Sequence, residues 1–107
     1  MQSLENRAAD INARTPDLIA DVTLYKPEDG GRRGPAPPGW GCPTMTSPGK
    51  PGWDAWPQLG EEWLQLGETR RVGFVFLSPE GAETMRTAGK FYLWEAGIKG
   101  EATVVSD

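Results

Sequence analysis

Apolar and polar residues alternate most regularly in residues 18–25, LIADVTLY. Ala20, Val22 and Leu24 occupy every second position, and their neighbours are mostly polar. This period of two is typical of a strand with one buried face. The segment is therefore the clearest predicted strand of the chain.

Further apolar segments predict the remaining strands. Residues 68–78, ETRRVGFVFLS, have apolar side chains on both faces, as expected for a central strand. The proline at position 57 predicts that residues 53–59 run along an edge of the sheet or contain a bulge. Residues 91–95 and 102–105 are predicted to form a closing pair that is joined through Gly97 and Gly100. The segments that follow the first strand are residues 40–46, 53–59, 68–78, 91–95 and 102–105.

The connections are rich in proline, glycine and small polar residues. Residues 47–52, SPGKPG, demand a turn, and residues 78–90, SPEGAETMRTAGK, are predicted to be a polar, turn-rich connection. Short strands at regular spacing without repeated helical blocks indicate an all-β antiparallel barrel or sandwich. A chain of 107 residues is the size of one such domain.

The N-terminal residues do not follow the strand pattern. Leu4, Ala8 and Ile11 share one side of a possible helix. Residues 1–16 are therefore predicted to be an extension that is either a short helix or disordered, and residues 17–107 form the domain.

Composition limits the chemistry that this chain can perform. Eleven basic and fifteen acidic residues give a net charge of −4, so the surface as a whole should repel nucleic acids, and RNA binding would need a local patch. The sequence contains no histidine, which is the commonest general base and metal ligand. The single cysteine excludes an internal disulfide, and no apolar run is long enough to span a membrane. We expect a cytoplasmic protein that is not an enzyme and holds no metal or cofactor.

Three motifs occur in the order seen in a known domain family. IADVTLYKPEDGGRRGP followed by GW, then LGETRRVGFVFLSP, then GKFYLWEAGIKGEATVV, resemble successive parts of the C-terminal (third) β-barrel domain of the elongation factor Tu family. The resemblance covers residues 18–105. It implies a closed six-stranded antiparallel β-barrel, here as a stand-alone protein.

The resemblance also implies where the chain could bind other molecules. In that family the third domain helps to hold aminoacyl-tRNA and contacts the nucleotide-exchange factor. The arginine of its GGR motif falls on Arg32 and the glutamate of its last hairpin on Glu95, whereas the amide of its Arg-Pro-Gln-Phe run is replaced by the hydroxyl of Thr44. The phosphate loop of the family's GTPase domain has no counterpart, because Pro51 follows Gly49-Lys50, and no GTP binding is expected.

The segment PEDGGRRGPAPPGWG, residues 27–41, carries the most distinctive candidate residues. We expect an ordered loop at the barrel rim, stiffened by its prolines and pinned by Trp40, with Arg32 held outward. Arg32 and Arg33 could meet a phosphate or a carboxylate of a partner. Alternatively, they could pair with the acidic residues of the same loop and keep the turn soluble.

The other reactive or aromatic residues have simpler interpretations. Most of the five tryptophans are expected to fill the barrel and cover its ends, with Trp53 and Trp56 the pair most exposed. Cys42 is expected to be a small buried filler, since no histidine exists to activate it. The carboxylates of Asp54, Glu61 and Glu62 are expected to form a solvated rim.

These observations lead to two functional hypotheses. In the first, the chain is a non-catalytic binding module that docks a translation-related macromolecule, which could be tRNA, an elongation factor or its partner. In the second, it is a protein-interaction or structural subunit unrelated to translation. The candidate partner-binding residues are Arg32, Arg33, Trp40, Thr44, Trp53, Trp56 and Glu95.

Overall fold

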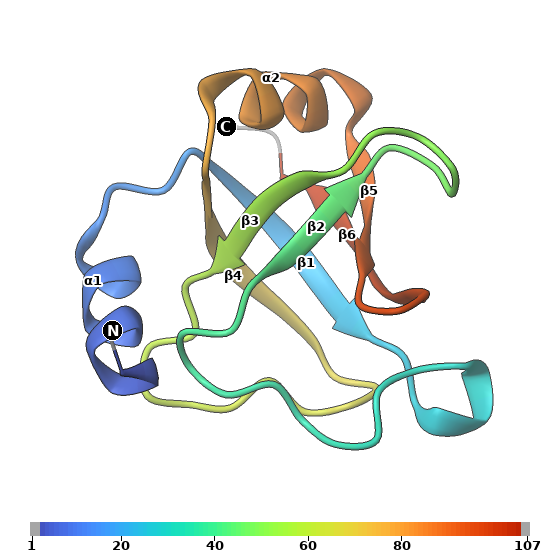
Figure 1. The fold of residues 1–107 in the computed structure, drawn as a ribbon, viewed down its shortest axis with the longest axis horizontal. Coiled ribbons are helices and arrows are strands. Elements are labelled where there is room, and N and C mark those ends of the chain that lie inside the picture. Colours follow the sequence, from blue (N-terminus) through green and yellow to red (C-terminus); the bar gives the residue numbers. More distant parts are fainter. Residues whose placement is uncertain (1–2, 106–107) are drawn as a thin grey trace.

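Six antiparallel strands close into a barrel in the computed structural model, which describes residues 3–105 (Figure 1). The elements are α1 (Leu4–Ala13), β1 (Leu18–Leu24), the 3-10 helix η1 (Pro27–Asp29), β2 (Cys42–Met45), β3 (Trp53–Pro57), β4 (Thr69–Phe76), α2 (Pro79–Ala88), β5 (Lys90–Trp94) and β6 (Ile98–Val104). The order around the barrel is β1-β4-β3-β2-β5-β6, and β6 pairs with β1. The predicted all-β barrel is thus confirmed, and each of the six described strands has a hydrogen-bonded neighbour on both sides.

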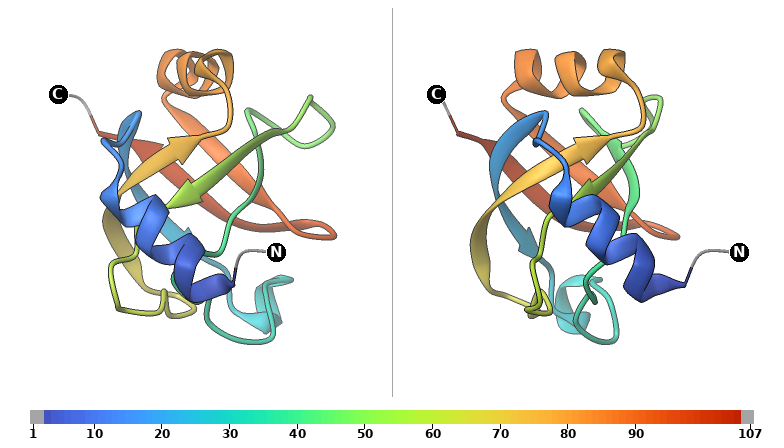
Figure 2. Two further views of the ribbon diagram at one scale, coloured as in Figure 1. Left: turned by 60° about the vertical axis from the view of Figure 1, so that its left-hand side comes forward. Right: turned by 90° about the vertical axis from the view of Figure 1, so that its left-hand side faces the viewer.

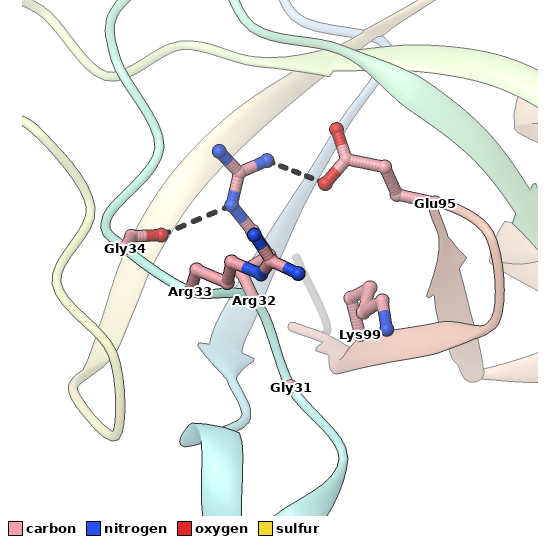
Figure 3. Close-up of a pocket in the computed structure, with 6 residues that line it drawn as sticks. All are labelled: Gly31, Arg32, Arg33, Gly34, Glu95 and Lys99. Atoms are coloured by element: carbon pink, nitrogen blue, oxygen red, sulfur yellow. Dashed lines mark hydrogen bonds and ion pairs between the residues drawn. The ribbon is translucent and has the colours of Figure 1, made fainter.

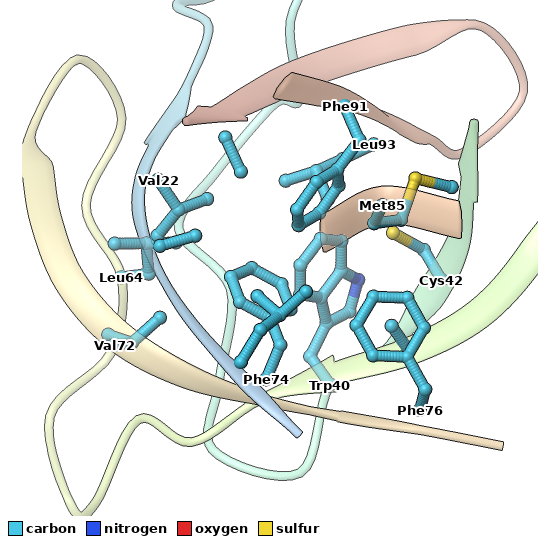
Figure 4. Packing of buried hydrophobic residues seen from close by; sticks show 14 of the residues in the cluster. Val22, Trp40, Cys42, Leu64, Val72, Phe74, Phe76, Met85, Phe91 and Leu93 are labelled. Atoms are coloured by element: carbon cyan, nitrogen blue, oxygen red, sulfur yellow. The ribbon is translucent and has the colours of Figure 1, made fainter. Parts of the chain in front are cut away.

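The inward side chains of the strands form one core. In β1, buried residues alternate with half-buried ones, as the sequence pattern predicts. Phe91 of β5 meets Phe74 and Phe76 of β4 edge to face, with ring centroids 5.2 Å and 6.1 Å apart (Figure 4). Such contacts between aromatic rings add to the stabilisation from area burial. The core therefore ties the last hairpin of the barrel to its central strand.

Helix α1 lies along the outside of the barrel (Figures 1 and 2). Its N-cap is Ser3, and it buries only Ala8 and Ile11. The side-chain amide of Gln58 donates hydrogen bonds to the carbonyl oxygens of Ile11 (2.9 Å) and Arg14 (2.7 Å). These two bonds fasten the end of the helix to the segment that follows β3.

Most of residues 78–90 form helix α2 (Pro79–Ala88) rather than the turn-rich connection that their composition predicts. The hydroxyl of Ser78 caps α2, and Gly89 ends it in the left-handed conformation with φ 79°. Ala82 and Met85 enter the core from its inner face. Because these apolar residues are few and polar ones surround them, the end signals carry more information here than the hydrophobic pattern does.

The two ends of the barrel are closed differently. Helix α2 lies across one end, whereas the long connection between β1 and β2 lies at the other (Figures 1 and 2). Strand β6 begins at Ile98, four residues before the predicted segment 102–105. The last hairpin is therefore tight, and it reaches toward the β1–β2 connection.

Of the described helices, neither α1 nor α2 is long and apolar enough to cross a membrane.

Candidate functional site

The connection between β1 and β2, residues 25–41, is a shaped loop that packs against the last hairpin. The backbone N–H of Tyr25 donates to the carbonyl of Lys99 (2.8 Å), and the Lys99 ammonium donates to the carbonyl of Gly30 (3.2 Å). Further along, Ala36 and Leu64 exchange two backbone hydrogen bonds of 3.0 Å and 2.9 Å. A side chain at Gly31 would collide with the backbone, since its Cβ would lie 1.8 Å from the carbonyl oxygen of Tyr25. Glycine is therefore required for this path.

Arg32, Trp40 and Glu95 form one cluster, which we call the Arg32 cluster. A guanidinium N–H of Arg32 donates to Glu95 Oε1 (2.7 Å), and the indole N–H of Trp40 donates to Glu95 Oε2 (3.2 Å). The guanidinium also lies over the Trp40 ring, 5.1 Å from its centroid, and donates through Nε to the carbonyl of Gly34 (3.1 Å). Both carboxylate oxygens and one cation are thus used to join the loop to the hairpin.

The expected outward position of Arg32 is wrong. Its side chain is only 17% exposed, and it pairs with Glu95 rather than with the acidic residues of its own loop. The reason is the Trp40 ring, which offers the guanidinium an aromatic face beside a carboxylate. Arg32 therefore has a positioning role in this arrangement.

A hollow of about 360 Å³ opens beside the Arg32 cluster (Figure 3). We call it the basic hollow, and its lining residues are Gly31, Arg32, Arg33, Gly34, Glu95 and Lys99. Arg33 is exposed and makes no side-chain hydrogen bond or ion pair with the residues that the structure describes. Lys99 uses one N–H for Gly30 and keeps two. These two cations are available to an anionic group.

Lys99 is not among the candidate site residues chosen from the sequence. Its position beside the loop could have been inferred, because the predicted closing pair must contact the first strand if the barrel is to close. Residues at the start of β6 then lie beside the loop that leaves β1. The early start of β6 places Lys99 in that position.

Thr44 does not belong to a binding surface. It is fully buried, and its hydroxyl donates to the carbonyl of Trp53 (2.7 Å). Its position in β2, paired with Leu93 of β5, turns the side chain into the barrel. The candidate role of Thr44 as a partner contact is therefore wrong.

The tryptophans are distributed differently from the expectation. Trp53 and Trp56 are both half-buried, whereas Trp63 (51%) and Trp94 (40%) are the exposed ones. Trp53 lies in a groove beside α2, and Trp56 in a separate one beside α1. Neither lines the basic hollow. Trp40 is 8% exposed and acts as the anchor that the sequence predicts for the loop.

The residues with catalytic potential are placed as expected. Cys42 is buried, and this burial raises the pKa of its thiol to about 12, so the reactive thiolate is disfavoured. Asp54, Glu61 and Glu62 are all exposed, in agreement with a solvated rim. Among the described residues, no group of three or more His, Cys, Asp or Glu side chains is placed to hold a metal ion.

The closed barrel therefore carries the basic hollow, with Arg33 and Lys99 in its lining, and two grooves that each contain a tryptophan. Comparison with known protein families finds no family model that matches this sequence, and no curated protein matches it significantly.

Proposed function

We propose that this protein is a non-catalytic binding module of the elongation factor Tu third-domain type. It docks a translation-related macromolecule in the cytoplasm, with the basic hollow as the contact site. The observation that carries the proposal is the pair of available cations, Arg33 and Lys99, beside the two residues that the resemblance selects, Arg32 and Glu95. GTP binding and catalysis are not part of this function.

The ordered loop supports a docking role because binding would require little further ordering. The Arg32 cluster and the Lys99 contacts already fix the loop against the hairpin. A surface that is ordered before contact loses less conformational entropy on binding. The planar guanidinium of Arg33 can donate two parallel hydrogen bonds to a carboxylate or phosphate.

The charge distribution favours a protein partner over tRNA. The whole chain carries a net charge of −4, which repels a polyanion at long range. Only two cations of the basic hollow are available, whereas nucleic-acid binding usually neutralises several phosphates. An acidic patch on an elongation factor or on its partner needs no more than one or two such contacts.

A titration against tRNA, ribosomes and the cell's elongation factor, at low and at physiological salt, tests the proposal. We expect binding of a protein component at physiological salt, weakened at least tenfold by Arg33→Glu. Lys50→Glu is the matched control, since it makes the same charge change on an exposed loop residue outside the basic hollow. Failure to bind any of the three, or equal losses in both variants, would contradict the proposal.

A second candidate function is a protein-interaction or structural role outside translation. It is favoured by the two grooves that contain Trp53 and Trp56, because half-buried tryptophans in hollows are frequent anchors of protein interfaces. A pull-down that captures mainly a non-translational protein, lost when Trp53 and Trp56 are changed to alanine, would favour this function. Retention of that protein by the double variant would exclude these grooves as its docking site.

A further inference from the structure

Helix α2 lies at the end of the barrel opposite the β1–β2 loop (Figures 1 and 2). Side chains of α2 and of Trp53, the first residue of β3, line a groove there. Its volume is about 570 Å³, and its lining residues are Trp53, Glu80, Glu83, Thr84 and Thr87. We call it the α2 groove. It shares no residue with the basic hollow.

The helical repeat explains why four of these side chains lie together. Glu80, Glu83, Thr84 and Thr87 are spaced three, four and seven residues from the first, so they share one face of α2. This face is distinct from the one that enters the core through Ala82 and Met85.

Gly81 sets the distance between α2 and Trp53. A Cβ at Gly81 would lie 2.9 Å from the Trp53 Cβ and 3.3 Å from an indole ring carbon. The missing side chain lets the helix approach Trp53 closely and holds the indole at the edge of the core. The ring remains half-buried and forms part of the groove wall.

The charged side chains that line the α2 groove, Glu80 and Glu83, are both acidic. Glu80 is exposed and makes no ion pair with any residue that the structure describes, whereas Glu83 pairs with Arg86 of the next turn. Among the residues that the structure describes, no lysine or arginine lines the groove. An aromatic ring with a free carboxylate beside it complements a cation that also has an apolar or planar surface.

We propose that the α2 groove binds an arginine side chain of a partner protein, stacked on the Trp53 indole and paired with the Glu80 carboxylate. The planar guanidinium can stack on the ring and donate to the carboxylate in the same pose, which a lysine ammonium cannot do as well. The threonine methyl groups would contact the aliphatic part of the arginine side chain. This site is independent of the docking proposed for the basic hollow, since it uses other residues and selects the opposite charge. It is one of the two grooves on which the second candidate function rests.

Titration of the full chain with two short peptides, acetyl-GRGRG-amide and acetyl-GKGKG-amide, tests this site. The indole N–H signal of Trp53, assigned in an NMR spectrum by its loss in Trp53→Phe, reports occupancy. We expect the arginine peptide to shift this signal and to bind at least threefold more tightly than the lysine peptide. Glu80→Gln should weaken the arginine peptide at least fivefold.

Two controls separate this site from general charge effects and from the basic hollow. Glu61→Gln removes an exposed carboxylate outside the α2 groove and should change the affinity less than twofold. Arg33→Glu, which tests the proposed function, should also leave peptide binding unchanged.

Several results would overturn the inference. They are an unshifted Trp53 signal, equal affinity for the two peptides, and wild-type affinity in Glu80→Gln. A self-associated protein that the arginine peptide dissociates, seen by sedimentation, would identify a second copy of this chain as the occupant instead. Glu80 is exposed, so its variant is expected to fold, and circular dichroism verifies this.

Discussion

Gly41 lies against the indole ring of Trp56, so closely that a Cβ at position 41 would come 2.2 Å from the ring carbon Cδ1. The register explains the contact, because Cys42 pairs with Ala55 and the residues on either side are therefore neighbours. The ring of Trp56 covers the backbone of the glycine on the outside of the barrel.

This contact predicts that Gly41→Ala destabilises the barrel. The added methyl group must displace a large ring that is already packed, which costs about 1–3 kcal/mol in an ordered structure. Denaturant unfolding followed by circular dichroism measures the free energy of unfolding. Gly34→Ala is the control, since a Cβ at Gly34 would meet nothing within 4 Å. Equal stabilities of the two variants would show that Trp56 does not hold this position.

The adjacent arginines of the β1–β2 loop are expected to differ in their effect on stability. Arg32→Ala removes a charge-assisted hydrogen bond to Glu95 and a contact with the Trp40 ring, and Glu95 is partly exposed. We expect a loss of about 1–2 kcal/mol. Arg33→Ala, which removes no such contact, should change stability by less than about 0.5 kcal/mol. Chemical unfolding of both variants checks this difference, and the reverse order would contradict the positioning role of Arg32.

Gln58 is expected to control how long α1 stays on the barrel. Gln58→Ala removes two hydrogen bonds to the end of α1, and each contributes about 1 kcal/mol. Because α1 buries only two residues, the loss should appear as local opening. Hydrogen exchange of the α1 amides should become about tenfold faster or more, with little change in the strands. Gln65→Ala alters an exposed residue and should leave this exchange unchanged.

The buried thiol of Cys42 is expected to lower the free energy of unfolding at alkaline pH. Burial raises the pKa of its thiol to about 12, which is above the value in the unfolded chain. The unfolded state therefore loses its proton first, and the stabilising effect of the neutral thiol is lost as the pH rises from about 9 to 12. An aromatic disulfide reagent at pH 8.5 should react with the folded protein only at the rate of unfolding. Rapid reaction without unfolding would show that Cys42 is accessible.

The barrel could be predicted because its strands keep the period of two even where they are short. The inward residues of β1 and β4 follow directly from this pattern. Helix α2 could not be found in the same way, because only Ala82 and Met85 form its apolar stripe and Gly81 interrupts it. Its Ser-Pro start and glycine end were the informative signals.

The loop residues of the site could be predicted from the sequence, but the directions of their side chains could not. Arg32 and Glu95 were selected through the resemblance, yet their pairing with each other depends on a contact between loop and hairpin that are 63 residues apart. Thr44 was assigned to the surface although the register turns it inward. The exposure of Trp63 and Trp94 depends on the packing of neighbouring segments, which composition cannot reveal.

The pairing of β1 with β4 and β6 has a consequence for synthesis of the protein. Ala20 pairs with Val72 on one side and with Val104 on the other, so β1 has no partner close to it in the sequence. Until β6 emerges from the ribosome, the nascent chain exposes two strand edges that could pair with those of another chain. Folding is then expected to be slow for so small a domain, and to depend on a late, long-range closure.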